Sequence, residues 1–176
     1  MIEDFELKEE FRKIKPFKVA FQKGLNIVVG ENGSGKSTLL ELLMKKNQVS
    51  VTHGNGTYHF LDTEKQNPRL KNPNGMGKLF DFGVLSRFSS HGEAMLPLIE
   101  TIKGFSEKII IIDEPESGIS LSNQKKVIGC IKKAAKDNQV ILTTHSYVII
   151  KNMDIVFSMD VKKWITQKEY FEKIKL

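Results

Sequence analysis

The chain has 176 residues, 27 basic and 21 acidic side chains, a formal net charge of +6, and 40% hydrophobic residues. These values are typical of one globular domain over residues 1–176 and exclude a disordered chain. The single cysteine, Cys130, excludes a disulfide framework and a cysteine-based zinc site, and it is expected in a reducing cytoplasm. The longest purely aliphatic run covers only residues 109–112, so no membrane span is expected, and the acidic N-terminus does not resemble a signal peptide.

Predicted strands and helices alternate along the chain. Strands are predicted over residues 17–21, which alternate apolar and polar, and over the apolar run 25–29, with a turn at Lys23-Gly24 between them. Further predicted strands cover residues 57–61, 108–113, 140–143 and 154–159. Helices are predicted over residues 39–44, 92–102 and 120–136, and Thr166 with Glu169 has the spacing of a capping box before a closing helix. Residues 63–77 are typical of a loop. This alternation predicts an α/β layer sandwich with a mainly parallel sheet.

The most specific motif follows the strand predicted at residues 25–29. Residues 30–37 read GENGSGKS, a complete G-x-x-x-x-G-K-S phosphate-binding loop. The glycines let backbone N–H groups turn toward phosphate oxygens, Lys36 adds a positive charge, and Ser37 supplies a hydroxyl group for Mg²⁺. A buried strand before the loop and a helix after it favour this interpretation over a flexible loop. The predicted nucleotide-binding residues here are Gly30, Glu31, Asn32, Gly33, Ser34, Gly35, Lys36, Ser37 and Thr38.

Two carboxylates end the strand predicted at residues 108–113. Four isoleucines precede Asp113 and Glu114, so both acids are expected at the carboxyl edge of the sheet, beside the phosphate-binding loop. There Asp113 would hold Mg²⁺, directly or through water, and Glu114 would orient or deprotonate the attacking water. The alternative is a strand that merely ends at polar residues, and the complete loop upstream favours the catalytic interpretation.

Two more motifs narrow the class of protein. Residues 89–93 read SSHGE, and residues 143–146 read TTHS. The order of phosphate-binding loop, S-x-G-E, apolar strand with Asp-Glu, and Thr-His resembles the ABC-type ATPases. Residues 24–33 (GLNIVVGENG) and 113–119 (DEPESGI) are similar to the SMC, recombination-repair and small cytosolic ATPase branch of that family rather than to its transporter subunits.

The resemblance implies a fold and a set of roles. The fold would be a P-loop layer sandwich with an N-terminal antiparallel β portion, and the activity would be hydrolysis of Mg·ATP between two subunits. Lys36, Glu114 and His145 would be catalytic. In that family the S-x-G-E motif binds the γ-phosphate of ATP held by the opposite subunit, so Ser90, Gly92 and Glu93 would complete the site of a second copy or of another ATPase chain.

The chain departs from the family pattern at three points. His91 stands where the motif often has glycine. Only 54 positions separate Lys36 from Ser90, which leaves no room for a large helical or coiled-coil insertion. Gln66 follows a predicted strand, as a Mg²⁺-sensing glutamine should, but it comes early in the chain, and a plain loop residue is the equal alternative.

Three other functions are alternatives for this sequence. A transporter's nucleotide-binding subunit would need a groove for a membrane protein, normally built by the missing helical subdomain. A DNA-repair or phage-defence module would use basic side chains, and residues 120–136 carry five lysines, although such a helix is more often a solvated surface. A P-loop kinase is disfavoured because it should avoid a water-activating carboxylate such as Glu114.

Overall fold

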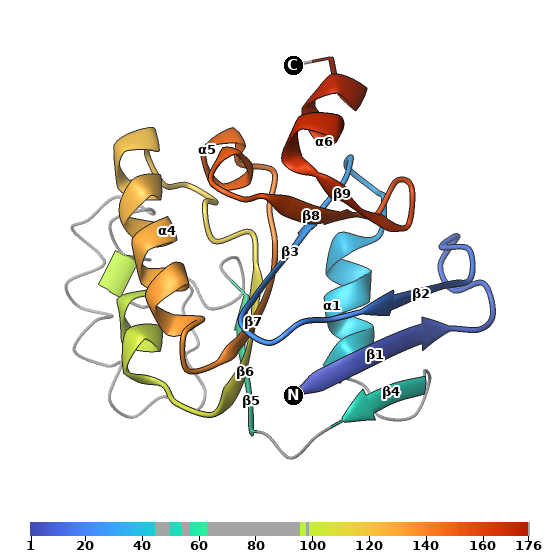
Figure 1. The fold of residues 1–176 in the computed structure, drawn as a ribbon, viewed down its shortest axis with the longest axis horizontal. Helices are drawn as coiled ribbons and strands as arrows, with labels where there is room; N and C mark the ends of the chain where they lie inside the picture. The colour runs from blue at the N-terminus through green and yellow to red at the C-terminus, as the bar shows by residue number, and fades with distance from the viewer. Residues whose placement is uncertain (45–49, 54–56, 63–95, 98, 176) are drawn as a thin grey trace, which may run out of the picture.

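The computed structural model describes residues 1–44, 50–53, 57–62, 96–97 and 99–175. Its central element is a six-stranded sheet in the order β5-β6-β7-β3-β8-β9 (Figure 1). The strands are β3 (Leu25–Val29), β5 (Thr57–Asp62), β6 (Lys108–Asp113), β7 (Gln139–Thr143), β8 (Ile155–Ser158) and β9 (Lys163–Thr166). All neighbouring strands are parallel except β9, which pairs antiparallel with β8. The predicted mainly parallel sheet is therefore confirmed.

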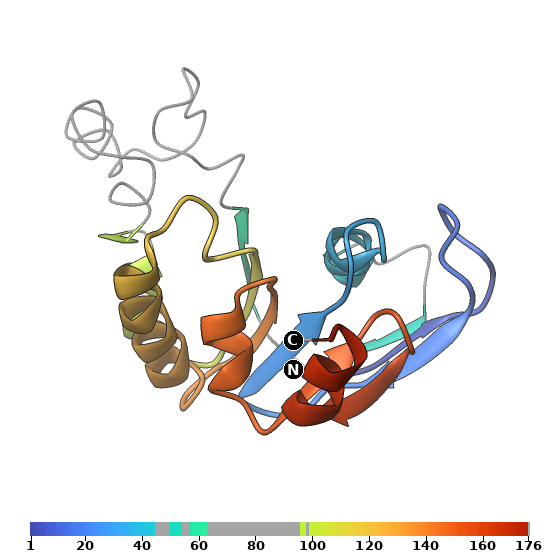
Figure 2. The same cartoon turned by 90° about the horizontal axis from the view of Figure 1, so that it is seen from above.

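A second, smaller sheet lies at the N-terminal side of the molecule. It has the order β2-β1-β4 and is antiparallel, with β1 (Ile2–Leu7), β2 (Phe17–Ala20) and β4 (Ser50–His53). Figures 1 and 2 both show it on the same side of the large sheet as α1 (Lys36–Met44). This is the N-terminal antiparallel portion that the family resemblance implies.

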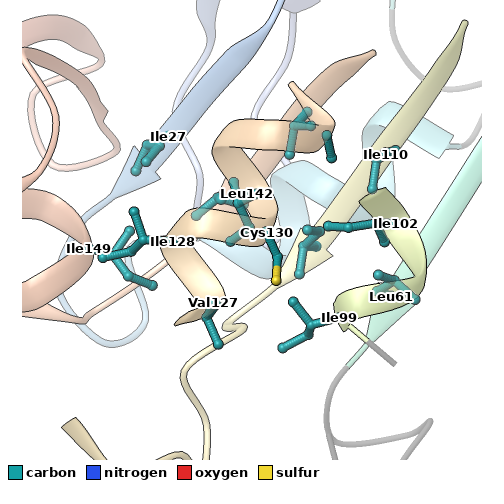
Figure 3. Close-up of a cluster of buried hydrophobic side chains, with 14 of the residues drawn as sticks. Ile27, Leu61, Ile99, Ile102, Ile110, Val127, Ile128, Cys130, Leu142 and Ile149 are labelled. Atoms are coloured by element: carbon teal, nitrogen blue, oxygen red, sulfur yellow. The ribbon is translucent and has the colours of Figure 1, made fainter. Parts of the chain in front are cut away.

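The central strands of the large sheet, β3, β6 and β7, are largely apolar and are buried on both faces. Ile109 and Ile111 of β6 pack with the leucines of α1 and with the small sheet. Ile110 and Ile112 point to the opposite face, which is covered by α4 (Leu121–Ala134), α5 (Tyr147–Lys151) and α6 (Gln167–Lys173). Figure 3 shows part of this second cluster, including Cys130 of α4. Since successive side chains of a strand alternate between its faces, one isoleucine run supplies both cores.

The predicted elements are largely confirmed, with shifted ends. The strand predicted at residues 154–159 is β8, and the helix predicted at 120–136 is the shorter α4. The capping box is present, since Thr166 Oγ1 accepts from Glu169 N–H and the Glu169 carboxylate accepts from Thr166 N–H. Of the helix predicted at 92–102, residues 96–97 and 99–101 are helical, Ile102–Gly104 form the 3-10 helix η1, and residues 92–95 and 98 lie outside the described residues. The predicted loop at 63–77 also lies outside them.

Among the elements that the structure describes, the residue pattern alone did not predict β1, β4, β9 and α5. In β1 the pairing with β4 shifts register between Ile2 and Phe5, so its buried residues do not alternate regularly. The helix α5 has only five residues, YVIIK, a composition that favours strands.

Candidate functional site

The site lies at the carboxyl edge of the large sheet, where the ends of β3, β7 and β6 are adjacent. Val28 of β3 pairs with Thr143 of β7, and Thr143 pairs in turn with Asp113 of β6. The chain segments that leave these three strands therefore start side by side. They are the phosphate-binding loop, the turn from Glu114 to Ile119, and the segment of residues 144–146 that carries His145. This edge of a parallel sheet is where open α/β proteins bind ligands.

The phosphate-binding loop has a backbone that requires glycine. Gly33 and Gly35 have φ values of 79° and 97°, in the left-handed region that L-residues with side chains rarely adopt. A Cβ atom on Gly35 would collide with the side chain of Ile14, and one on Gly30 would lie 2.6 Å from Ser34 Oγ. The loop closes through a hydrogen bond from Ser34 N–H to the carbonyl oxygen of Glu31 at 3.1 Å. The glycine pattern thus reflects steric need as well as flexibility.

Lys36 closes the loop from the first turn of α1. The residue is only 5% exposed, and its Nζ donates to the carbonyl oxygens of Gly30 and Glu31, both at 3.0 Å. Burial lowers the pKa of the Lys36 ammonium, and the nearby carboxylates of Glu114, Asp160, Asp113 and Glu116 oppose this shift. Ser37 is exposed and Thr38 half-buried at the start of the same helix. A partly desolvated cation at this position is suited to attract phosphate.

One hydroxyl group, Thr143 Oγ1, joins the carboxylate of Asp113 to the main chain of Glu114. Thr143 Oγ1 donates a hydrogen bond to Asp113 Oδ1 and accepts one from Glu114 N–H at 3.2 Å. Glu114 also has a φ of 46°, a left-handed conformation that costs a residue with a side chain about 1–2 kcal/mol. Strain of this kind persists where the surroundings hold the backbone, and it is common at functional sites. Thr143 itself is fully buried, and the TTHS motif to which it belongs predicts no such role for it.

The carboxyl group of Glu114 faces the imidazole of His145. Glu114 Oε1 and His145 Nε2 are 3.4 Å apart, and the two side chains are 37% and 35% exposed. Burial raises the pKa of Glu114, and the nearby Glu116 and Asp113 add to the shift while His145 and Lys36 oppose it. A carboxylate with a raised pKa is a stronger base, so the structure favours proton acceptance at this position.

Two features of the site were not predicted. Asp160, in the turn after β8, accepts a hydrogen bond from Glu31 N–H at 3.1 Å, and no local motif marks it. A cavity of about 230 Å³ also adjoins the loop and His145, and α5 and α6 provide its other wall. That wall consists of Tyr147, Ile150, Tyr170, Phe171 and Ile174.

The remaining predicted site residues lie outside the described residues. They are Gln66, Ser90, Gly92 and Glu93. Of the predicted magnesium ligands, Ser37 and Asp113 are described, and their hydroxyl and carboxylate oxygens are the kind of donor that Mg²⁺ prefers, so they fit the ion. Within the described ranges, no group of three or more His, Cys, Asp or Glu side chains is arranged to hold a metal.

Family comparisons cover both halves of the site. A model of AAA domains (AAA_21), described in connection with the AbiEii toxin and a type IV toxin–antitoxin system, matches residues 73–151. A second AAA-domain model (AAA_23) matches residues 9–44. The first match includes both carboxylates and His145, and the second includes the phosphate-binding loop.

The chain is also similar to part of a DNA double-strand break repair Rad50 ATPase from Thermococcus kodakarensis. The identity is 30% over 82 residues, covering 40% of this chain. The match spans only 9% of the Rad50 protein's length.

Solved structures share the fold over nearly the whole chain. A Pyrococcus furiosus ATP-binding protein, assigned to an ABC transporter, has 16% identity and a TM-score of 0.65, covering 92% of this chain and 100% of that one. An ATP-binding cassette of an ABC transporter in its ADP conformation has 14% identity and a TM-score of 0.62, covering 99% and 96%. A dimeric cassette bound to ADP and Pi has 14% identity and a TM-score of 0.55, covering 94% and 96%.

At these identities the structural likeness concerns the fold alone. In the part of the chain that the structure describes, no helix is both long and apolar enough to cross a bilayer. The chain therefore combines a fold shared with ATP-binding cassettes with partial sequence similarity to AAA-domain models and to a Rad50 ATPase.

Proposed function

We propose that this chain is a single ATPase domain, residues 1–176, that binds Mg·ATP and hydrolyses it to ADP and phosphate. The observation that carries the proposal is the convergence of Lys36, the Asp113–Glu114 pair and His145 at one sheet edge, with Glu114 and His145 3.4 Å apart. These groups lie at the ends of, or directly after, three strands that are distant in sequence and adjacent in space. The single cysteine and the ATPase-type fold favour a cytoplasmic protein.

Each residue has a distinct task in this proposal. The backbone N–H groups of the loop and the Lys36 ammonium bind the β- and γ-phosphates. Glu114 orients the attacking water and accepts its proton, and His145 donates a hydrogen bond to the γ-phosphate. Ser37 and Asp113, with Gln66 as a further candidate, would hold Mg²⁺, which neutralises phosphate charge when bound.

The second half of the site would come from another subunit. By resemblance, Ser90, Gly92 and Glu93 of a second copy, or of a different ATPase chain, reach the γ-phosphate bound at Lys36. The dimeric cassette among the structural relatives supports such an arrangement for this fold. ATP would then join two subunits and hydrolysis would release them.

Replacement of the proposed base tests this function directly. Glu114→Gln should retain ATP binding and lose turnover by roughly 10²–10⁴-fold, because an amide cannot accept the proton. With ATP it should form a stable dimer, and with ADP or no nucleotide it should remain a monomer. Glu172→Gln, an exposed change on α6, is the matched control. A mass that is the same in all three states, with a rate per chain independent of concentration, would contradict the sandwich dimer.

A nucleic-acid-associated role is the second candidate, and the Rad50 similarity favours it. The lysines of the α4 region are exposed, while the opposite side of the helix is buried. They are Lys125, Lys126, Lys132, Lys133 and Lys136. DNA binding that weakens steeply between low and physiological salt, and weakens further in Lys133→Glu, would support this role. No binding at low salt would refute it. The transporter-subunit alternative has only the shared fold in its favour.

A further inference from the structure

Glu116 lies two residues after Glu114 in the turn that follows β6, and its carboxylate accepts hydrogen bonds from the segment of residues 144–146. Glu116 Oε1 accepts hydrogen bonds from Thr144 Oγ1 at 2.7 Å, from His145 N–H at 2.6 Å and from Ser146 N–H at 3.0 Å. The turn is itself closed by a bond from Ile119 N–H to the Glu116 carbonyl oxygen at 2.9 Å. One carboxylate oxygen therefore fixes the main chain that carries His145.

His145 is thus held at two points by two acids of one turn. Its imidazole lies 3.4 Å from Glu114 Oε1, and its main-chain N–H lies 2.6 Å from Glu116 Oε1. Glu114 and Glu116 are separated by a single residue, the buried Pro115. Because the proline ring fixes the backbone φ angle, the two glutamates can move little relative to each other. The distance between the Glu114 carboxyl group and the His145 imidazole therefore depends on the bonds that Glu116 makes.

The same segment is braced from the far side by α4 and α5. Ser146 Oγ donates to Gln124 Oε1 at 2.6 Å and accepts from Ile149 N–H at 3.1 Å, which caps α5. Gln124 Nε2 donates to the carbonyl oxygen of Ile119 at 3.1 Å, at the end of the turn that contains Glu116. The network is closed, so loss of the Glu116 acceptor would free one side of residues 144–146 while the other side stays anchored.

A carboxylate that accepts backbone N–H groups forms charge-assisted bonds, which are roughly twice as strong as neutral ones. The second oxygen, Oε2, is buried and has no hydrogen-bond partner among the described residues. Among the described residues, the hydrogen bonds of the Glu116 side chain are therefore made to residues 144–146.

We infer that Glu116 is a positioning residue, which holds the main chain of residues 144–146 so that His145 meets Glu114. Its effect on catalysis rests on the proposed function, whereas its effect on the main chain does not. Glu116 would act only through His145 and would touch neither nucleotide nor water.

Amide hydrogen exchange of the full chain without nucleotide tests the structural part. In Glu116→Ala the amide of His145 should exchange on the order of 10-fold faster or more, because it loses a charged acceptor. The amide of Ser146 should change less, because its N–H also donates to Thr144 Oγ1 at 2.9 Å. In Glu116→Gln both amides should exchange more slowly than in Glu116→Ala, since the side-chain carbonyl oxygen can accept the same bonds although it carries no charge. Glu10→Ala, at an exposed position, is the matched control. Unchanged exchange of both amides in Glu116→Ala would overturn the inference.

ATP hydrolysis tests the catalytic part. Glu116→Ala should lower kcat on the order of 10²-fold with little change in KM, because a small misplacement of a reacting group is costly. The double variant with His145→Ala should be no slower than His145→Ala alone, since both changes remove one unit. Additive losses would overturn the inference, and so would a Glu116→Gln variant that loses as much as Glu116→Ala.

Amide exchange and ATP hydrolysis together distinguish a failure of the inference about Glu116 from a failure of the proposed function. If Glu116→Ala does not fold, Glu116→Gln provides the test. Exchange and kcat close to those of the wild type would support a role as hydrogen-bond acceptor, and a large loss of kcat would refute it. If the wild-type chain does not hydrolyse ATP, the proposed function fails while the exchange rates still decide the role of Glu116.

Discussion

At Glu114, a strained backbone and a partly buried carboxyl group occur in one residue. Its φ of 46° turns the chain sharply after β6, and its N–H group is held by Thr143 Oγ1. Burial raises the pKa of its carboxyl group. Both features cost folding free energy, which is a common property of residues retained for chemistry.

The raised pKa of Glu114 predicts a pH dependence. The carboxylate must be ionised to accept a proton, so kcat at saturating ATP should rise with pH through a range above that of an ordinary glutamate. Because the folded chain binds this proton more tightly than the unfolded chain does, ionisation destabilises the fold as pH rises through the same range. Glu114→Gln should remove this cost, which is small because the side chain is 37% exposed.

Two measurements check this prediction. A pH profile of kcat should show the acid limb in the wild type and in Glu172→Gln. Unfolding at pH 7 should find Glu114→Gln at least as stable as the wild type, with the advantage shrinking as pH falls. An advantage that grows toward acid pH would show that the sign of the shift is wrong.

We expect Lys36 to contribute more to ATP binding than to the stability of the fold. Its ammonium is desolvated, and burial lowers its pKa, so the folded state holds the cation at some cost. Lys36→Ala should weaken ATP binding by about 10–100-fold, the value of one charged hydrogen bond, and leave the unfolding midpoint nearly unchanged. Calorimetric titration with ATP checks the affinity, and Lys125→Ala on the exposed side of α4 is the control. Wild-type affinity in a folded Lys36→Ala chain would remove the loop from the site.

At the scale of elements, two glycines with different surroundings give a matched test of backbone conformation. Gly35 has a φ of 97°, and an added Cβ atom would collide with Ile14. Gly129 lies inside α4, with nothing within 4 Å of an added Cβ atom. Gly35→Ala should therefore destabilise the chain by about 1–3 kcal/mol and impair ATP binding, whereas Gly129→Ala should stabilise it by about 1 kcal/mol.

Chemical denaturation of the two variants beside the wild type measures both effects. Opposite signs are the expected result, because the same substitution removes backbone freedom in a helix and introduces strain in the loop. Destabilisation by Gly129→Ala would mean that α4 packs more tightly than its surroundings indicate.

Among the elements, agreement between sequence and structure depends on how regular each pattern is. The buried strands β3 and β6 were predicted because continuous apolar runs next to charged or glycine-rich segments are local signals. The strand β1 was missed because its register shift interrupts the alternation of Ile2, Phe5 and Leu7. The strand β9 has half-buried and exposed residues only, so its partner β8 determines it rather than its own composition.

At the scale of the whole molecule, the proposed dimer makes the S-x-G-E motif essential in a second copy. Gly92→Arg should block close approach of the backbone to a phosphate held by the other subunit. This variant should bind ATP almost normally, remain a monomer and lose hydrolysis. Mixing it with Lys36→Ala is the sharper experiment, because each mixed dimer keeps one intact composite site, and activity should partly return. No recovery in the mixture, with both chains folded, would contradict a shared site.

Local sequence was sufficient to predict a phosphate-binding loop, a carboxylate pair and a histidine segment as parts of one site. Glycines at fixed spacing, a lysine at a helix start and acids after an isoleucine run report conformation and chemistry within a few residues of themselves. The two acids were expected beside the phosphate-binding loop at one edge of a parallel sheet, and the structure confirms this and places the histidine segment at the same edge.

The contacts that join these segments were not predictable in the same way, because they depend on strand order and register. Thr143 meets Asp113 only because β7 lies beside β6, and 30 positions separate the two residues. Glu116 reaches the N–H group of His145 across 29 positions, and nothing in the local pattern around either residue indicates that bond. Sequence periodicity reports which face of an element is buried, whereas the side chains that meet at the end of a sheet are set by how the whole chain packs.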